Sequence, residues 1–257
     1  MNPQPPFTLR PAATLVIFRQ SSADPEPQLL MVERAATMRF AAGATVFPGG
    51  KVDPQDAELA QILTGEAQDE YSDMAARIAA IRETLEETGL ALGFTRRPTR
   101  EEAMEARAIL QAGATMADML KRLDLSLDLS LLTPFARWRR ESVGGFDTRF
   151  YLANIGTGAV DLLVDATENS RLFWASAAQC LDDAAKGDIK IILPTQLNLE
   201  RLAPLANFDQ AVANALAHPV TPISARRIMR DGQEWLTIPE GLGYPTTALP
   251  LSATSRG

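Results

Sequence analysis

The chain has 257 residues, 46% hydrophobic and 22% charged, a composition typical of globular proteins rather than disordered or fibrous ones. Its 25 Lys and Arg against 32 Asp and Glu give a net charge of −7, which argues against a general binder of nucleic acid or anionic membranes. One cysteine, Cys180, and one histidine, His218, exclude a disulfide framework, a Cys-rich zinc site and a His-rich metal site. An enzyme with this composition would use carboxylates, lysine, tyrosine or a hard cation for acid–base chemistry.

The N-terminal residues lack the apolar region and cleavage site of a signal peptide, and no run approaches 18 consecutive apolar residues. We therefore expect a cytoplasmic protein that does not cross a membrane.

Residues 12–18 form a short, apolar, β-branched run that predicts a buried strand, and residues 28–33 predict its hairpin partner. A further short strand ends in Phe47-Pro48-Gly49-Gly50, which indicates a tight turn. Residues 53–72 are acidic, and we expect them to be irregular. From Asp73 onward the apolar residues follow a helical spacing, and Gly89 stands where a helix would end.

The remaining elements alternate irregularly between helix and strand, which predicts a mixed α/β layer fold. We expect helices over 99–111, 114–123, 175–186, 194–206 and 208–217, strands over 129–140, 148–155 and 171–174, and a closing hairpin over 219–229 and 234–238.

Three glutamates share one face of the helix that begins at Asp73. Glu83 lies three residues before Glu86 and four before Glu87, opposite the apolar stripe. Like charges at these spacings destabilise a helix by roughly 0.2–0.5 kcal/mol per pair, and the negative end of the helix dipole adds about 0.3–1 kcal/mol for each carboxylate. A bound Mg²⁺ or Mn²⁺ would reverse both effects, because these ions prefer oxygen ligands. The alternative is a solvated acidic face. The preceding strand and glycine pair favour the ion site, because glycine backbone can approach an ion or phosphate closely.

This stretch resembles the Nudix hydrolase signature G-x5-E-x7-R-E-U-x-E-E-x-G-U, in which U is bulky and apolar. The matching residues are Gly50, Arg82, Glu83, Glu86, Glu87, Gly89 and Leu90. Two features depart from the pattern. First, 31 residues separate Gly50 from Arg82, where the family has 13. Second, Met74 stands eight residues before Arg82, where the family has Glu, and the first U is Thr84. Glu66 or Glu70 is our candidate for the missing carboxylate.

A closer similarity, to the coenzyme A diphosphatase subgroup of this family, rests on the inserted box, the helical segment after it and three short motifs at 138–140, 146–152 and 193–195. Residues 32–53 resemble the subgroup's upstream element more loosely. The resemblance implies an α/β/α sandwich with a mixed sheet over residues 9–240. An insert inside the box at about 53–72 and a helical insert at about 99–123 are expected, followed by an irregular tail over 241–257.

The resemblance also implies divalent-metal-dependent hydrolysis of a diphosphate linkage, most directly in coenzyme A or acyl-coenzyme A, giving 3′,5′-ADP and (acyl-)phosphopantetheine. Glu83, Glu86, Glu87 and the Gly49 carbonyl are the expected ligands of Mg²⁺ or Mn²⁺. Arg82 would hold Glu86, and Glu83 is our candidate for a general base or a bridging ligand. The further candidates are Arg34, Arg39 and Gly50 as substrate contacts and Glu168 as an accessory carboxylate.

Two alternatives remain open on the sequence. One is a Nudix hydrolase of nucleoside diphosphates such as ADP-ribose or NADH, and the other is a non-catalytic Nudix-like binding module, suggested by Met74. In each case the expected partner is a small nucleotide-type molecule, not nucleic acid or a membrane. A homodimer is plausible by analogy with other Nudix enzymes.

Overall fold

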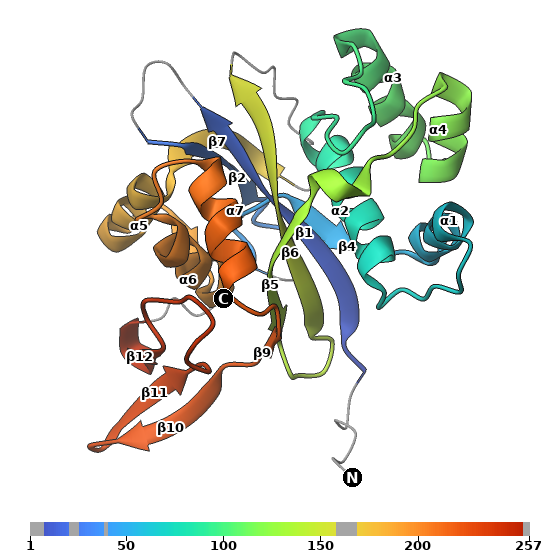
Figure 1. Ribbon diagram of the computed structural model, residues 1–257. Coiled ribbons are helices and arrows are strands. Elements are labelled where there is room, and N and C mark those ends of the chain that lie inside the picture. The colour runs from blue at the N-terminus through green and yellow to red at the C-terminus, as the bar shows by residue number, and fades with distance from the viewer. Residues whose placement is uncertain (1–7, 21–25, 39–40, 158–168, 254–257) are drawn as a thin grey trace.

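The computed structural model describes residues 8–20, 26–38, 41–157 and 169–253. A mixed sheet lies between two layers of helices, as Figure 1 shows, so the predicted α/β/α sandwich is confirmed. Its strand order is β8-β3-β2-β1-β6-β5-β9, with β4 paired to β1 and β7 paired to β2. The order places strand β1 (Arg10–Gln20), which pairs with the glycine-containing strand β4 (Gly49–Lys51), in the middle of the sheet.

Strand β1 (Arg10–Gln20) organises this sheet. It pairs in parallel with β6 (Phe146–Thr157) and antiparallel with β2 (Gln28–Arg34), which confirms the predicted pairing of the first two strands. Strands β5 and β6, which lie at two of the predicted strand positions, pair antiparallel. The other strands of this sheet are β3 (Ala44–Val46), β4 (Gly49–Lys51), β5 (Thr133–Arg139), β7 (Asn169–Ser176), β8 (Lys190–Ile191) and β9 (Pro222–Ile223).

Successive side chains of β1 pack into two separate cores. Leu15 and Ile17 face one helical layer, whereas Val16 and Phe18 face the other. Because both faces of the strand are buried, its sequence is continuously apolar instead of alternating.

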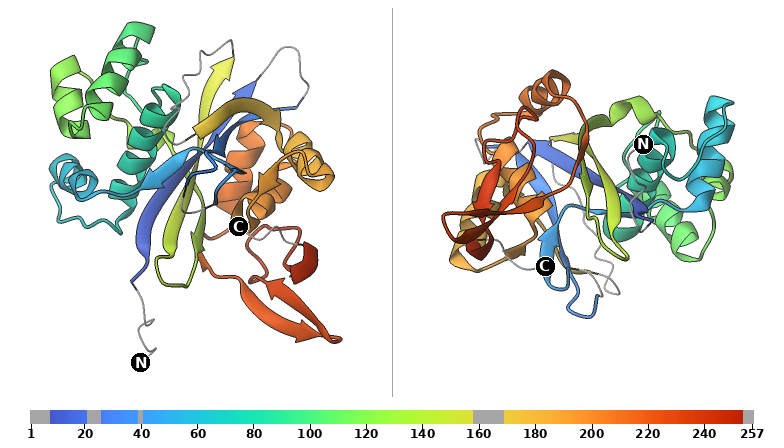
Figure 2. Two further views of the ribbon diagram at one scale, coloured as in Figure 1. Left: turned by 180° about the vertical axis from the view of Figure 1, so that it is seen from behind. Right: turned by 90° about the horizontal axis from the view of Figure 1, so that it is seen from below.

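Helices α1 to α4 cover one face of the sheet and α5 to α7 cover the other, as the views in Figure 2 also show. The apolar stripe predicted on α2 lies in the first core, where Ile78, Ile81 and Leu85 are fully buried. The helices are α1 (Pro54–Thr64), α2 (Asp73–Thr88), α3 (Arg100–Gln111), α4 (Met116–Leu123), α5 (Ala177–Lys186), α6 (Leu193–Leu202) and α7 (Phe208–Ala217).

Helix α1 corrects the expectation that residues 53–72 are irregular. Asp53 is its N-cap, Pro54 occupies the first helical turn, where proline is favoured, and Gly65 ends it in a left-handed conformation. Leu59 and Ala60 attach the helix to the core beside α2. Its other large apolar residues, Ile62 and Leu63, are exposed, so the apolar residues do not mark a single helical face in the sequence.

The C-terminal part forms a second, three-stranded sheet of β10 (Arg226–Arg230), β11 (Gln233–Thr237) and β12 (Ala248–Pro250). The predicted hairpin is confirmed by the pairing of β10 with β11. The prediction of an irregular tail is wrong at β12, which pairs antiparallel with β11. Leu129–Leu131 is a short 3₁₀ turn instead of the start of a strand. Within the described residues, no helix has both the length and the apolar character needed to span a membrane.

Candidate active site

The last two turns of α2 carry the three glutamates toward β4. Ser72 caps the start of the helix by accepting a hydrogen bond from the Ala75 N–H, and Gly89 ends it with φ +75°. Glu87 is only 4% exposed, so the alternative of a fully solvated acidic face is wrong for this residue. The face opposite the helix's own apolar stripe is thus covered by other parts of the fold.

The glycine pair lies inside strand β4, not in the predicted turn. Ala13 and Thr14 of β1 pair with Gly50 and Gly49, and the bend falls at Pro48. A side chain on Gly50 would place its Cβ 2.5 Å from Glu83 Oε1, so only glycine leaves room for this carboxylate. The Gly49 N–H donates a hydrogen bond to Glu87 Oε2 at 3.1 Å. Two carboxylates of α2 therefore meet the backbone of one short strand.

Arg82 links α2 to α1 through a buried ion pair with Asp56. Its Nε and Nη2 donate to the two oxygens of Asp56 at 3.1 and 2.9 Å, and Nη2 also donates to the Lys51 carbonyl. Nη1 lies 3.0 Å from Glu83 Oε1 and 3.6 Å from Glu86 Oε2. The predicted contact with Glu86 is present, but the shorter contacts are with Asp56 and Glu83.

Asp56 is a site residue that the sequence analysis missed. The signature places its first glutamate eight residues before the arginine and six residues after the first glycine. Eight residues before Arg82 is Met74, whereas six residues after Gly50 is Asp56. Asp56, rather than Glu66 or Glu70, occupies the place beside Arg82. The insertion therefore follows this acidic position instead of displacing it.

Burial makes the three carboxylates unusually weak acids. It raises the pKa of Glu83 to about 7 against the opposing charge of Arg82. Burial and the neighbouring charge of Glu83 raise the pKa of Glu87 to about 8, while the Gly49 N–H opposes the shift. The pKa of Glu86 is raised as well, again mainly by burial. The cluster would be stabilised in its charged form by a cation.

Asn169, the first residue of β7, is a second residue that the sequence analysis did not single out. It is 1% exposed and its amide lowers the pKa of Glu87, although no hydrogen bond of normal geometry joins either amide atom to a described residue. Arg34, opposite Asn169 in the β2–β7 ladder, also lowers the pKa of Glu87 by its charge. The only sequence signal for Asn169 was its position next to Glu168. Glu168 itself and Arg39 lie outside the described residues.

Comparison with known proteins identifies the family of the chain. A model described as the NUDIX domain matches residues 8–107. The crystal structure of a NUDIX hydrolase from Alicyclobacillus acidocaldarius is 30% identical, with a TM-score of 0.68, over 81% of this chain and 97% of that one. The chain is a Nudix hydrolase. Such enzymes hydrolyse nucleoside diphosphates that are linked to a further group.

Two curated relatives agree with this assignment. The putative nudix hydrolase 7 of Caenorhabditis elegans is 27% identical over 241 residues, which are 89% of this Nudix hydrolase and 71% of that protein. The uncharacterized Nudix hydrolase NudL of Cronobacter sakazakii is 50% identical over 64 residues, 24% of this chain and 31% of that protein.

The residues of this Nudix hydrolase fit the divalent cation that enzymes of the family generally use. Carboxylate oxygens are the donors that Mg²⁺ and Mn²⁺ prefer, and the buried amide of Asn169 lacks a hydrogen-bond partner among the described residues. In the described part of the chain, no three acidic, histidine or cysteine side chains are already gathered as ligands. Binding would therefore require rotation of the glutamate side chains.

Proposed function

We propose that this Nudix hydrolase cleaves the diphosphate linkage of coenzyme A or an acyl-coenzyme A, giving 3′,5′-ADP and phosphopantetheine or its acyl derivative. The observation that carries the proposal is the convergence of Glu83 and Glu87 on the Gly49–Gly50 strand. Both carboxyls have raised pKa values there, as expected of groups that would be stabilised by a cation.

Glu83, Glu86 and Glu87 would hold Mg²⁺ or Mn²⁺, with the Gly49 carbonyl as a further oxygen donor. Such an ion supplies charge neutralisation for the diphosphate and lowers the pKa of a bound water. The acidic overall charge of the chain does not oppose this function, because the substrate's negative charge is met locally.

Arg82 has a positioning role in this proposal. Its guanidinium is fixed by Asp56 and the Lys51 carbonyl, and its remaining Nη1 holds Glu83 at 3.0 Å. Burial works to lower the pKa of Arg82, but its hydrogen bonds to Asp56 and the charge of Glu83 raise it on balance, so it stays charged. Glu83 lies between Arg82 and the Gly49–Gly50 strand and is our candidate for a general base or a bridging ligand.

The choice of coenzyme A rests on the sequence similarity of residues 32–53 and of the motifs at 138–140, 146–152 and 193–195. Helices α3 and α4 follow the box where the subgroup has its helical segment. Arg34 lies close enough to influence Glu87 and is our candidate contact for a substrate phosphate. The non-catalytic alternative loses its basis, because Asp56 supplies the carboxylate that Met74 lacks.

A substrate screen tests this function. Purified protein is incubated with coenzyme A, decanoyl-coenzyme A, ADP-ribose and NADH in Mg²⁺, Mn²⁺ or EDTA, and products are identified by mass spectrometry. We expect hydrolysis of a coenzyme A compound at least tenfold faster than of the other two, and none in EDTA. Glu86→Gln should abolish turnover, whereas Glu105→Gln, an exposed residue of α3, should not.

Equal turnover of all four compounds, or faster turnover of ADP-ribose or NADH, would overturn the coenzyme A assignment. Undiminished turnover in EDTA would overturn the metal-dependent reaction.

A further inference from the structure

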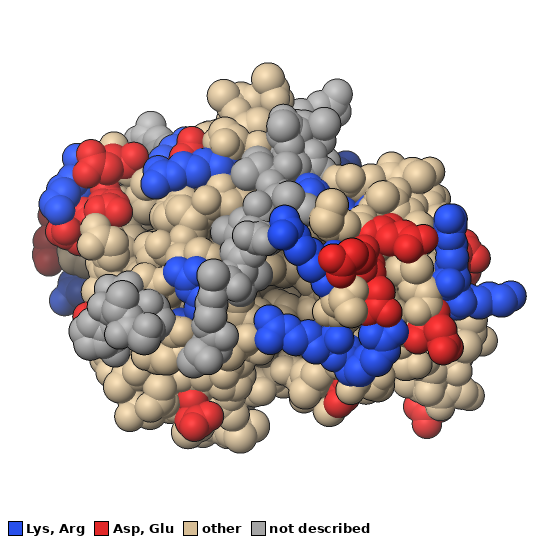
Figure 3. All heavy atoms as spheres, turned by 90° about the horizontal axis from the view of Figure 1, so that it is seen from above, with Lys and Arg blue, Asp and Glu red and all other residues tan. Residues whose placement is uncertain are grey.

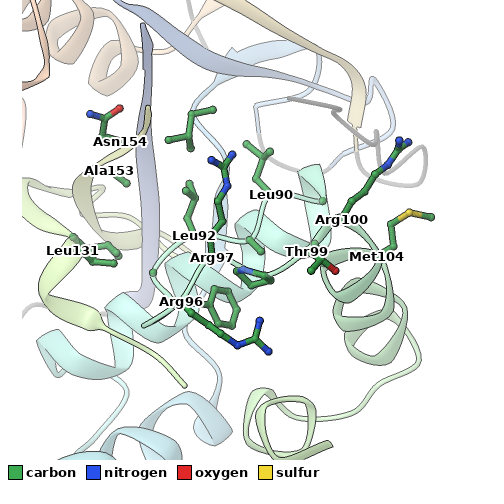
Figure 4. Close-up of a pocket in the computed structure, with 18 of the residues that line it drawn as sticks. Leu90, Leu92, Arg96, Arg97, Thr99, Arg100, Met104, Leu131, Ala153 and Asn154 are labelled. Carbon is green, nitrogen blue, oxygen red and sulfur yellow. The ribbon is translucent and has the colours of Figure 1, made fainter. Parts of the chain in front are cut away.

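A cavity lies beyond the end of α2, outside the carboxylate site. It has a volume of about 580 Å³, within the range of roughly 300–1,000 Å³ typical of small-molecule sites. Its walls are the segment between α2 and α3, the start of α3, the turn before β5, the end of β6 and Phe208 at the start of α7. Figure 4 shows Leu90, Leu92 and Arg97 on the first of these segments, with Arg100 and Met104 on α3.

The cavity combines apolar walls with positive charge. Leu90, Leu92, Phe94, Leu132 and Ile155 supply the apolar surface, while Arg96, Arg97 and Arg100 supply guanidinium groups. None of the described lining residues is acidic, in a chain whose net charge is −7. Figure 3 looks down on this end of the molecule and shows Lys and Arg side chains near its middle, with acidic side chains on either side.

Arg97 is the cation that this arrangement leaves available. Arg96 is paired with both oxygens of Glu102, at 2.8 and 2.7 Å. Arg97 is exposed and makes no hydrogen bond or ion pair with any residue that the structure describes. It stands beside Leu90 and Leu92 in the cavity wall. A ligand that satisfies both features needs an anionic group next to an apolar chain.

The lining is poorly suited to a nucleotide base. Its neutral polar side chains among the described residues are Thr99 and Asn154, too few to match the several donors and acceptors of a base edge. Of the two aromatic lining residues, Phe94 is buried and Phe208 packs edge-to-face against Phe18. Apolar walls and a guanidinium suit a fatty carboxylate better, because a bidentate charge-assisted hydrogen bond can anchor the headgroup.

We propose that this cavity binds the aliphatic chain of a fatty acyl compound, with Arg97 contacting its anionic group and Leu90, Leu92 and Leu132 contacting its chain. The chain's source is either a free fatty carboxylate or an acyl group carried by a larger anionic molecule. This inference stands apart from the hydrolysis proposed above, since none of the glutamates takes part.

Calorimetry in EDTA tests the proposal on the intact protein, because no hydrolysis is needed. The probes are sodium decanoate, below its micelle concentration, and the uncharged 1-decanol. We expect decanoate to bind about tenfold more tightly than decanol, since one charge-assisted contact is worth about that factor. Arg97→Gln should remove this difference, and the matched exposed variant Arg227→Gln on β10 should retain it.

A second pair of variants tests the place of binding. Met104 and Leu131 are 49% and 51% exposed at the cavity, so Met104→Trp and Leu131→Trp should fill its mouth without disturbing the core. Each should weaken decanoate binding at least tenfold, while Met229→Trp, 66% exposed on β10, should not. Absence of decanoate binding, or binding unaffected by Arg97→Gln and by both tryptophan variants, would overturn the proposal.

Competition in EDTA then identifies the chain's source. Displacement of decanoate by decanoyl-coenzyme A, but not by coenzyme A, assigns the cavity to an acyl group on a larger molecule. Lack of displacement assigns it to the free carboxylate. The calorimetry measures binding and not turnover, so its failure would not change the result of the substrate screen. Equally, failure of the substrate screen would not contradict fatty acyl binding in the cavity.

Discussion

Replacing Gly50 by alanine should sharply reduce turnover while largely preserving the fold. The added Cβ would lie 2.5 Å from Glu83 Oε1, and ordinary contact begins at 3.4 Å, so the oxygen must retreat by about 0.9 Å. The neighbouring atoms are the end of a flexible side chain, which can move without shifting the backbone. A displacement of about 1 Å at a reacting group can reduce turnover by on the order of 100-fold.

Gly49→Ala is the contrasting variant. Its Cβ would lie 2.6 Å from Thr14 Cα and also against the Ala13 carbonyl, both backbone atoms, at a φ of +152° that L-residues rarely adopt. This change should therefore lower the melting temperature markedly, whereas Gly50→Ala should alter it little. Gly65→Ala, at another positive φ but with no atom near its Cβ, carries the backbone strain of such a change without the clash and is the control for it.

The assay compares kcat for the best compound of the substrate screen with the melting temperature of each variant. Full activity in Gly50→Ala would refute the requirement for Glu83 at β4. A Gly49→Ala protein as stable as the wild type would refute the close packing of β4 against β1.

Three further predictions concern the same cluster. Asp56→Asn should lower the free energy of unfolding by about 1.5–3 kcal/mol in urea denaturation, since it weakens two charge-assisted hydrogen bonds of the buried Arg82, which keeps Glu83 as a partner; a loss as small as that of an exposed surface carboxylate would contradict the pairing. In EDTA, the raised pKa values of Glu83 and Glu87 make the folded protein bind more protons than the unfolded chain between about pH 4.5 and 8, so thermal stability should fall as pH rises through this window. Mn²⁺ should counteract the fall and bind more tightly at pH 8 than at pH 6, with proton release visible by calorimetry in two buffers; pH-independent affinity would contradict the shifts. Asn169→Ala removes an amide that favours the charged form of Glu87, so the pH midpoint of Mn²⁺ binding should move upward, and an unchanged midpoint would show that the amide does not act on Glu87.

The sequence predicted the parts of the site that depend on local spacing. The helical period from Asp73, the acidic face of α2 and the end at Gly89 are all present as expected. These features depend on residues within a few turns of one another, which is why the sequence reveals them.

The surroundings of the glutamates could not be predicted from α2 alone. Gly49 and Gly50 form a strand only because β1, more than 30 residues earlier, pairs with them. Asp56 reaches Arg82 across the insertion, and a pattern counted from one end of the box does not show where the additional residues lie. Asn169 comes from β7, whose place beside β2 is set by the whole sheet.

The most direct test of the central claim is anomalous diffraction from crystals of the protein soaked in Mn²⁺. The account predicts a manganese peak beside the Gly49–Gly50 strand, at about 2.0–2.3 Å from carboxylate oxygens of Glu83, Glu86 or Glu87, and its loss in Glu86→Gln crystals. A peak bound elsewhere, or none at this strand while the glutamates remain apart, would contradict it.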